Sequence, residues 1–257
     1  MRLLVTGATG VLGREVLVAA RSVGIAVRAV SRRPAPAHTE GEEWMQADLV
    51  TGHGLDEAVR GCDAVVHAAS DPRKADAVDV NGTRLLAEAA GRASVRHLVL
   101  VSIVGVDQIP FSYFKRKLAA EQIVSRTNVP FSILRATQFH PFLDQMIAAA
   151  ARVPVVLPVP RGFLVQPVEA SEVAQRLMRC IADGPRGRVA DFGGPEVLSF
   201  GDAAVQWQEA RRVRKRIVPI PVPGPMAKAI RAGKGTAPQG DRGVISWQEW
   251  LMGTRDL

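Results

Sequence analysis

The first thirteen residues contain the feature that most restricts the fold, a strand that runs into a glycine-rich turn. The apolar run Leu3–Val5 leads into Gly7, Gly10 and Gly13, and a helical apolar pattern follows. In a dinucleotide-binding turn the first glycine permits the sharp turn, the second lets the backbone approach a pyrophosphate, and the third allows close helix packing. The N-terminus of the following helix offers unpaired N–H groups to phosphates. The pattern predicts a nucleotide site, although a purely structural turn would use the same glycines.

Strand and helix patterns alternate along the remaining chain, which predicts an α/β class with a doubly wound parallel sheet, the Rossmann fold. We expect residues 1–150 to form the NAD(P)-binding domain and residues 151–257 a small C-terminal α/β substrate region that shares its core. Predicted strands cover residues 3–5, 26–30, 43–47, 62–67, 97–102, 131–135, 188–192 and 217–220. Predicted helices cover residues 11–20, 54–59, 76–90, 118–124, 143–151, 171–182, 199–212 and 246–252.

Composition restricts the compartment and the partners. A chain of 257 residues can bury a large core without disulfides, and Cys62 and Cys180 lack metal-ligand spacing. We expect both to be buried thiols in a reducing cytoplasm, with no bound metal. The chain has no uncharged apolar run of membrane-spanning length, so we expect no membrane partner and a small-molecule substrate, with the protein a monomer or homodimer.

The net charge of +8 is densest over residues 210–216, which contain five Lys or Arg residues. Such a block can bind nucleic acid or an acidic partner, or it can be a solvated helix end that complements the helix dipole. No nucleic-acid-binding motif accompanies it, so we favour the helix end and regard nucleic-acid binding as the weaker interpretation.

The end of the second predicted strand indicates which dinucleotide is bound. Ser31, Arg32 and Arg33 occupy the place where an NAD-selective site usually carries an acidic residue for the ribose 2′-hydroxyl. Guanidinium groups suit a 2′-phosphate, so the sequence favours NADP(H). Asp48 ends the third strand, where it can bind the adenine amino group or cap the next segment.

The fourth strand ends in small residues, Ala68, Ala69 and Ser70, which would let the backbone approach the cofactor closely. His67 precedes them without a second candidate ligand nearby. We therefore interpret it as a core histidine rather than a metal ligand.

Ser102, Tyr113 and Lys117 are the candidate catalytic residues. Tyr113 is the only tyrosine, and Lys117 follows it at i+4, on the same helix face. We expect the lysine ammonium to lower the pKa of the phenol, and the Ser102 hydroxyl to polarise a substrate carbonyl. The alternative is an exposed helix start with Ser112 as its N-cap.

A possible substrate pocket follows the strand at 131–135. Phe139 is placed to cover a nicotinamide and His140 to line the pocket, because open α/β sheets bind ligands at this edge. The proline-rich segment 153–160, which ends near Phe163, suits a pocket wall, a lid or an edge strand.

Five segments together resemble the short-chain dehydrogenase/reductase superfamily, and more narrowly its atypical NmrA-like, NAD(P)H-binding branch. The resemblance runs from residue 1 to about Asp183. The segments are Thr6–Gly13, Asn81–Thr83, Ser102–Val106, Tyr113–Lys117 and Leu134–Phe139.

The resemblance implies a Rossmann domain and specific roles for residues of this chain. Gly7, Thr9, Gly10, Val11 and Leu12 would hold the diphosphate, Arg32 the 2′-phosphate, Asp48 and Leu49 the adenine, Ala68, Ala69 and Ser70 the stretch from diphosphate to ribose, and Lys117 the nicotinamide ribose.

Three functions follow from these observations. The first is an NADPH-dependent oxidoreductase that reduces a small apolar carbonyl or quinone by hydride transfer. The second is a non-catalytic NADP(H)-binding redox sensor. The third, which the arginines disfavour because it needs retained NAD, is a nucleotide-sugar epimerase.

Overall fold

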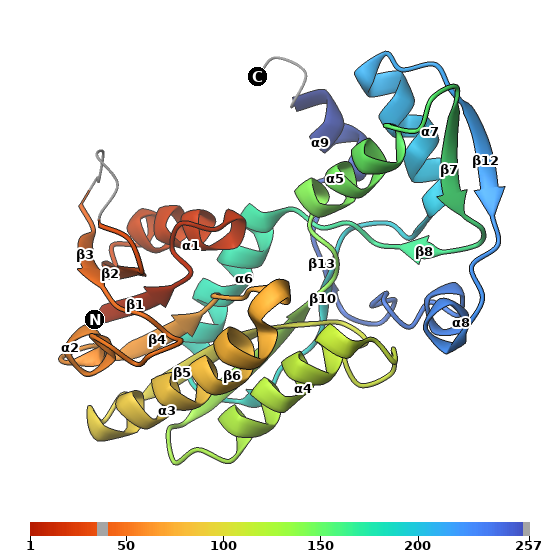
Figure 1. The fold of residues 1–257 in the computed structure, drawn as a ribbon. Helices are drawn as coiled ribbons and strands as arrows, with labels where there is room; N and C mark the ends of the chain where they lie inside the picture. Colours follow the sequence, from red (N-terminus) through yellow and green to blue (C-terminus); the bar gives the residue numbers. More distant parts are fainter. Residues whose placement is uncertain (35–40, 254–257) are drawn as a thin grey trace. The chain divides into compact units, whose positions relative to one another are not determined.

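The alternating pattern builds a parallel sheet in the computed structural model, which describes residues 1–34 and 41–253 (Figure 1). Six strands lie in the order β3-β2-β1-β4-β5-β6, the order of a dinucleotide-binding fold, so the predicted doubly wound fold is confirmed. Their bounds are β1 Arg2–Thr6, β2 Ala26–Ser31, β3 Glu43–Gln46, β4 Ala64–His67, β5 His97–Ile103 and β6 Phe131–Ala136.

Helices cover both faces of this sheet, which explains why its central strands are almost continuously apolar. α1 packs against α6, and α3 packs against both α2 and α4. A π-helix, η2, precedes α3 without a break. The bounds are α1 Val11–Ser22, α2 Leu55–Val59, η1 Pro72–Lys74, η2 Asp76–Asn81, α3 Gly82–Arg92, α4 Ser112–Ser125 and α6 Ala170–Asp183.

The described residues form two units. Unit 1 comprises Met1–Ser102, Ser112–Arg135 and Ala170–Val189, and unit 2 comprises Ile103–Phe111, Ala136–Glu169 and the described residues from Ala190 onward. The division into residues 1–150 and 151–257 remains a prediction, and the last four residues of the second range lie outside the described residues.

Unit 2 has its own core, in which helices enclose Leu143, Ile147, Leu157, Trp207 and Trp247. Segment 153–160 supplies a strand, β7, which pairs in parallel with β12. The bounds are α5 His140–Ala150, β7 Val156–Pro160, β8 Leu164–Val165, β10 Phe192–Gly193, β11 Leu198–Ser199, α7 Phe200–Arg211, β12 Arg216–Ile220, α8 Pro225–Arg231, β13 Asp241–Arg242 and α9 Trp247–Gly253.

The predicted strand at 188–192 is wrong, because the chain forms two short strands there, β9 (Gly187–Arg188) and β10. Arg188 pairs with Ile133 of β6, whereas Phe192 pairs with Ala136. Phe192 is four residues after Arg188, whereas their partners in β6, Ala136 and Ile133, are only three residues apart. This extra residue interrupts the ladder as a β-bulge does.

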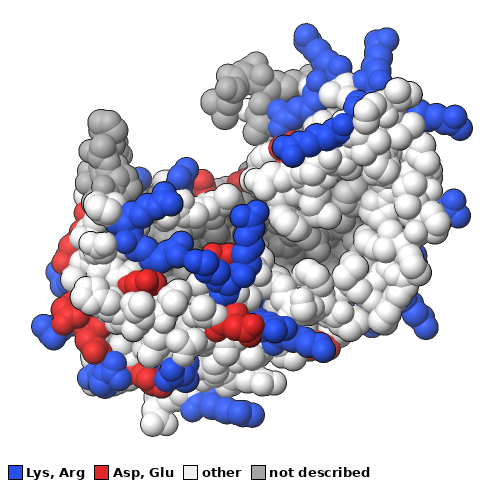
Figure 2. Space-filling view, in the orientation of Figure 1, with Lys and Arg blue, Asp and Glu red and all other residues white. Residues whose placement is uncertain are grey.

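Two of the five cations in the basic block at 210–216 form contacts within unit 2. The Arg211 guanidinium pairs with Asp144 at 3.1 Å, and Lys215 Nζ donates to the carbonyl oxygens of Ala151 and Val153, just after α5. A cation at a helix C-terminus is favourable there. Figure 2 shows other Lys and Arg side chains of this unit projecting from its surface.

The glycine turn is packed too tightly for side chains. Gly7 has a φ of +69°, and a Cβ there would lie 2.7 Å from the Ala69 backbone. A Cβ on Gly13 would lie 2.0 Å from the carbonyl oxygen of Gly7. α1 can therefore lie against the turn only because residue 13 is glycine.

We expect Gly13→Ala to destabilise the protein by roughly 1–3 kcal/mol, the usual cost of overpacking, because the turn must move away from the new methyl group. The measurement is urea unfolding followed by circular dichroism. Gly91→Ala in α3 is the matched control, since its Cβ would meet Val129 at an ordinary 3.7 Å. Equal stability of the two variants would contradict the packing argument.

Candidate cofactor site and catalytic group

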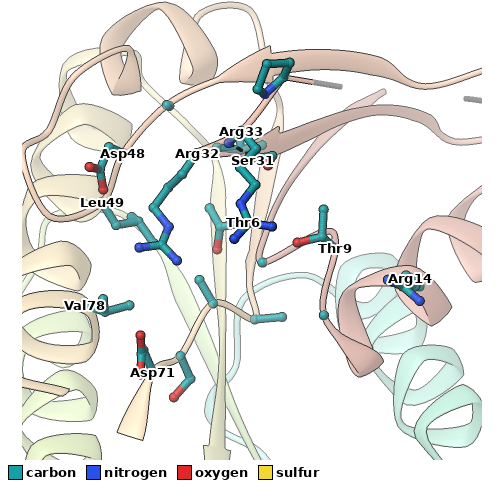
Figure 3. A pocket seen from close by; sticks show the side chains of 18 residues that line it. Thr6, Thr9, Arg14, Ser31, Arg32, Arg33, Asp48, Leu49, Asp71 and Val78 are labelled. Atoms are coloured by element: carbon teal, nitrogen blue, oxygen red, sulfur yellow. Dashed lines mark hydrogen bonds between the residues drawn. The ribbon is translucent and has the colours of Figure 1, made fainter. Parts of the chain in front are cut away.

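A cavity of about 620 Å³ lies in unit 1 at the carboxyl ends of β1, β2 and β4 (Figure 3). Ligand pockets usually have volumes of about 300–1,000 Å³. The lining residues are Thr6, Gly7, Thr9, Gly10, Arg14, Val30, Ser31, Arg32, Arg33, Pro34, Ala47, Asp48, Leu49, Ala68, Ala69, Ser70, Asp71 and Val78. Most predicted cofactor residues therefore line one cavity; Val11, Leu12 and Lys117 do not.

The first turn of α1 supplies hydrogen-bond donors at this cavity. Gly10 is the N-cap and has no side chain to cap the helix, and the first turn carries no acidic residue. The N–H groups of Val11 and Leu12 belong to this turn, where helical N–H groups have no partner within the helix. The Leu12 side chain is buried in the core, so Leu12 can contact a ligand only through its backbone, whereas the Val11 side chain is 50% exposed.

Arginine side chains border the cavity on the β2 side. Figure 3 shows the side chains of Arg32 and Arg33 extending from the end of β2 over the cavity, and Figure 2 shows cationic groups around a hollow on unit 1. Among the described residues neither guanidinium forms an ion pair. Ser31 Oγ accepts a hydrogen bond from the Arg33 N–H at 3.1 Å, which shapes the turn that directs them. Two unneutralised guanidinium groups suit a phosphate dianion.

Asp48 and Leu49 after β3, and the small residues after β4, also line the cavity. Asp48 Oδ1 accepts a hydrogen bond from the Val50 N–H at 2.9 Å within the turn after β3, and Asp48 also lines the cavity. It does not cap the next helix, α2, whose N-cap is Gly54. Gly7 and Ala69 approach each other so closely that Gly7 has no room for a side chain, so only backbone atoms of Gly7 line this part of the cavity. These features fit a dinucleotide, because its diphosphate needs backbone donors and its adenine an apolar wall.

A hydrogen-bonded group connects the cavity wall to Tyr113. Ser70 Oγ lies 2.6 Å from the Tyr113 hydroxyl and 2.6 Å from Asp79 Oδ1. Asp79 Oδ2 accepts a hydrogen bond from the Asp71 N–H at 3.2 Å. Lys117 Nζ lies 3.5 Å from Asp79 Oδ1 and donates to the Val101 carbonyl oxygen at 3.0 Å. Four polar side chains thus form one network, which we call the Ser70 network: Ser70, Asp79, Tyr113 and Lys117.

The electrostatics of the Ser70 network differ from our expectation. Burial raises the pKa of Tyr113 to about 12, the charges of Asp79 and Asp71 add to this, and the Ser70 hydrogen bond acts in the opposite direction. The predicted lowering by Lys117 is therefore wrong. Lys117 is only 4% exposed, and burial lowers its own pKa while Asp79 opposes that change. Its charge is directed to Asp79 rather than to the phenol.

Ser102 lies at the end of β5 but outside the Ser70 network. Its side chain is 3% exposed, and its hydroxyl has no hydrogen-bond partner among the described residues. The structure therefore brings together Tyr113 and Lys117 through Ser70 and Asp79, and leaves Ser102 apart from them. Its catalytic role stays a prediction.

The sequence analysis missed Asp79, Asp71 and Arg14, which belong to the network or to the cavity wall. Arg14 follows the third glycine directly, and position alone could have indicated it. Asp79 lies in the π-helix η2, a rare form often found at functional sites. Apolar periodicity gives no signal for such an insertion.

His67 lies in the core, as predicted, 1% exposed. Its Nδ1 lies 2.7 Å from Thr6 Oγ1 and its Nε2 lies 2.9 Å from Thr83 Oγ1. Thr83 in turn donates to the Asp79 carbonyl oxygen at 2.5 Å. The imidazole thus connects β1 with the helix that carries Asp79.

The three predicted substrate-pocket residues lie in unit 2. His140 is fully buried, its Nδ1 is 3.2 Å from Glu169 Oε2, and its ring packs against Trp247 and Trp250. Phe139 is the half-buried N-cap of α5, and Phe163 packs against the unit 2 core. Their contact with a substrate stays a prediction.

Comparison with known families identifies the class. A family profile described as NAD(P)H-binding matches residues 7–183, more than half of the chain. The chain therefore belongs to this NAD(P)H-binding family, the NmrA-like atypical branch of the short-chain dehydrogenase/reductases, and the predicted nicotinamide cofactor is confirmed as NAD(P)H.

Curated relatives include reductases. The chain is 31% identical over 209 residues to (4-alkanoyl-5-oxo-2,5-dihydrofuran-3-yl)methyl phosphate reductase of Streptomyces griseus, covering 79% of this chain and 72% of the relative. It is 33% identical over 156 residues to 4-hydroxy-2-methyl-3-oxo-4-farnesyl-3,4-dihydroquinoline-1-oxide ketoreductase of Stigmatella aurantiaca, covering 51% and 47%. It is also 31% identical over 156 residues to Photosystem II assembly factor Ycf39 of Trieres chinensis, covering 58% and 49%. The chain spans about half the length of the last two relatives.

Solved structures share the fold. A nucleoside-diphosphate-sugar epimerase from Staphylococcus aureus gives a TM-score of 0.78 at 16% identity, covering 98% of this chain and 100% of that one. A short-chain dehydrogenase/reductase superfamily protein from Agrobacterium tumefaciens with bound NAD gives 0.74 at 21%, covering 100% and 96%. An NADPH-dependent quinone oxidoreductase from Escherichia coli gives 0.76 at 17%, covering 98% of each. At these identities the likeness is one of fold.

No helix in residues 1–34 and 41–253 has the length and apolarity needed to cross a membrane.

The buried His67 makes stability depend on pH. Burial, with a smaller effect of the Lys117 charge, lowers the pKa of His67 from 6.5 to about 3. Between these values the unfolded chain binds a proton that the folded protein does not, so stability falls as the pH falls below about 6.5. From about pH 7.5 to about pH 5 this one group should remove about 2 kcal/mol of unfolding free energy.

We expect His67→Asn to lose stability at neutral pH but to show a smaller acid-side loss, by about 2 kcal/mol, in urea unfolding at the two pH values. His53→Asn removes an exposed histidine and is the matched control. An unchanged acid-side loss in His67→Asn would rule out His67 as its source.

Proposed function

We propose that this protein is an NADPH-dependent reductase of a small apolar carbonyl or quinone substrate. The observation that carries the proposal is the position of Ser70, which lines the cavity and also hydrogen-bonds the only tyrosine of the chain. A cofactor in this cavity would thus lie beside a phenol that can donate a proton. Two relatives are named as reductases, which supports the same reaction class.

Each part of the cavity has a proposed task in cofactor binding. The N–H groups at the start of α1 bind the diphosphate, and Gly7, Thr9 and Gly10 form the loop that contacts it. Arg32, Arg33 and Ser31 bind the 2′-phosphate. Asp48 and Leu49 border the adenine, and Ala68, Ala69 and Ser70 let the chain approach the ribose. Lys117 keeps one of its three N–H donors for the nicotinamide ribose.

When bound, the nicotinamide supplies a hydride, which brings both electrons to a substrate carbon. Tyr113 then breaks its O–H bond and gives the proton to the substrate oxygen, and solvent returns a proton to the phenolate. With its pKa raised to about 12 by burial, the phenol is protonated at neutral pH and is available as the proton donor. Lys117 stabilises the site through Asp79, and Ser102 polarises the carbonyl if the strand end opens to substrate.

A redox sensor that binds NADP(H) without turnover is the second candidate. Ser102 is buried apart from Tyr113, and one relative carries the name of an assembly factor; both observations favour it. An epimerase is less well supported, because the likeness to the epimerase structure is one of fold.

The proposed reaction is tested by following NADPH absorbance with a panel of quinones, aldehydes, ketones and enones. We expect Tyr113→Phe and Lys117→Met to lower kcat/KM by roughly 10²-fold or more, the usual contribution of a positioned proton donor. Lys115→Met, two residues before Lys117 and exposed, is the control and should retain activity. NADPH binding without any turnover would support the sensor instead.

Cofactor choice is tested by calorimetry with NADPH and NADH. We expect Arg32→Ala to weaken NADPH binding roughly 10- to 100-fold, the value of hydrogen bonds to a charged group, and to change NADH binding little. Arg92→Ala on exposed α3, whose partner is Asp56, is the control. Equal weakening for both nucleotides would mean that Arg32 does not read the 2′-phosphate.

A further inference from the structure

Two loops meet at the end of unit 2 where β7 and β12 begin. The two strands pair in parallel, so the loops that precede them lie side by side (Figure 1). Lys215 joins these loops, since its Nζ donates to the carbonyl oxygens of Ala151 and Val153. We call residues 152–155 and 212–216 together the unit 2 tip.

The unit 2 tip exposes apolar side chains to solvent. Val155 is 80% exposed and Val153 is 41% exposed, and Pro154 between them is exposed as well. Val155 also has a φ of +67°, in the left-handed region that a β-branched residue rarely adopts. This conformation costs the valine free energy, and the exposed side chain gains no packing within the unit that would offset the cost. A strained and exposed valine therefore indicates a contact with a partner.

Cations surround these apolar side chains without acidic residues nearby in the sequence. Residues 210–240 contain eight Lys or Arg residues and no Asp or Glu, and residues 145–168 contain two Arg residues and no Asp or Glu. Figure 2 shows cationic side chains projecting around this end of unit 2. Four arginines of the tip are exposed and form no ion pair within residues 1–34 and 41–253: Arg152, Arg212, Arg214 and Arg216.

An open hollow of about 970 Å³ lies beside the tip, at the end of α7. Val205, which is 44% exposed, gives it an apolar wall, and Arg212 and Arg214 bring two guanidinium groups to it. Guanidinium groups bind phosphate oxygens in a bidentate manner, so the hollow suits a phosphate-bearing headgroup. The lining residues, of which Glu209 alone is acidic, are Val205, Gln208, Glu209, Arg212, Val213, Arg214 and Lys215.

We propose that the unit 2 tip binds the surface of an anionic phospholipid bilayer. The arginines contact the lipid phosphates, and Val153 and Val155 enter the boundary between headgroups and acyl chains. A bilayer offers negative charge and apolar chains next to each other, which matches valines placed among arginines. A nucleic acid would leave these valines in water, and the tip has no aromatic side chain on which a base could stack.

A peripheral contact of this kind needs an exposed patch of apolar and cationic side chains rather than a membrane-spanning helix. Our expectation of no membrane partner rested on the absence of an apolar run of spanning length, and it does not exclude such a contact. The residues of the tip belong neither to the cofactor cavity nor to the Ser70 network, so the contact is independent of the proposed function.

Sedimentation with vesicles tests the charge. The full chain is mixed with vesicles of phosphatidylcholine alone, or of equal parts phosphatidylcholine and phosphatidylglycerol, and we expect binding to the anionic vesicles only, weakened by added salt. Arg152→Ala/Arg214→Ala should weaken this binding roughly 25-fold, about fivefold for each arginine. Arg126→Ala/Arg179→Ala removes the same charge from exposed positions of unit 1 and is the matched control, which should bind nearly as well as wild type.

Val155→Asn tests the apolar contact. Asparagine adopts the left-handed conformation more readily than valine, so the free energy of unfolding in urea should stay the same or rise. Vesicle binding should nevertheless weaken roughly tenfold, because the variant loses the apolar area that the valine removes from water on binding. A folded, equally stable variant that binds more weakly cannot owe its weaker binding to misfolding.

The outcomes separate a bilayer from other anionic partners. Equal binding to phosphatidylcholine alone, or equal weakening by the two double arginine variants, would mean that the tip does not recognise anionic lipid. If Val155→Asn binds vesicles as tightly as wild type, and polyglutamate binds as tightly as the vesicles do, the tip is a site for an acidic protein and the proposal fails. These measurements need neither cofactor nor substrate, so an inactive protein refutes the proposed function without deciding this inference.

Discussion

The close contact between the glycine turn and the strand end beside it determines the rest of unit 1. Gly7 lies against Ala69, and Gly13 lies against Gly7, with no space for a Cβ at either glycine. Because the backbones meet directly, the first turn of α1 is held at the carboxyl edge of the sheet, where its N–H groups are available. The same contact places Ser70, which directly follows Ala69, on the cavity wall. Cofactor cavity and Ser70 network therefore share one structural origin.

The sequence predicted which segments line the cavity where the lining residues are adjacent in sequence. The glycine turn, the arginines after β2 and the small residues after β4 each directly follow an apolar strand, and parallel strands bring their carboxyl ends to one edge. The strands of the sheet could be predicted because near-continuous apolar runs mark strands that are covered on both faces. The division at 188–192 could not, because one extra residue in a strand leaves the apolar pattern unchanged.

The Ser70 network shows what residue spacing cannot predict. An i,i+4 spacing puts Tyr113 and Lys117 on one helix face, but it does not say which groups that face meets. Lys117 is buried, and a buried ammonium needs a carboxylate more than a phenol. Asp79 provides that carboxylate from a π-helix, whose wider turn no apolar pattern reveals. The lysine thus stabilises Asp79, and the phenol turns to Ser70 instead.

Unit 1 keeps its unpaired cations exposed and its buried charges paired, as the cost of desolvating a charge requires. Arg32 and Arg33 are exposed at one end of the cavity, where cations that form no ion pair within residues 1–34 and 41–253 lose little hydration and can bind a phosphate. Asp79 and Lys117 are buried, and the desolvation cost of each charge is offset by its ion pair with the other. An anionic ligand is therefore attracted to the exposed arginines, whereas the buried pair contributes no net charge and acts by directing hydrogen bonds. Under the proposed function the exposed arginines select the nucleotide, whereas the buried pair holds Asp79 within hydrogen-bond distance of Ser70. These are separate properties of neighbouring residues, so changing one should leave the other largely intact.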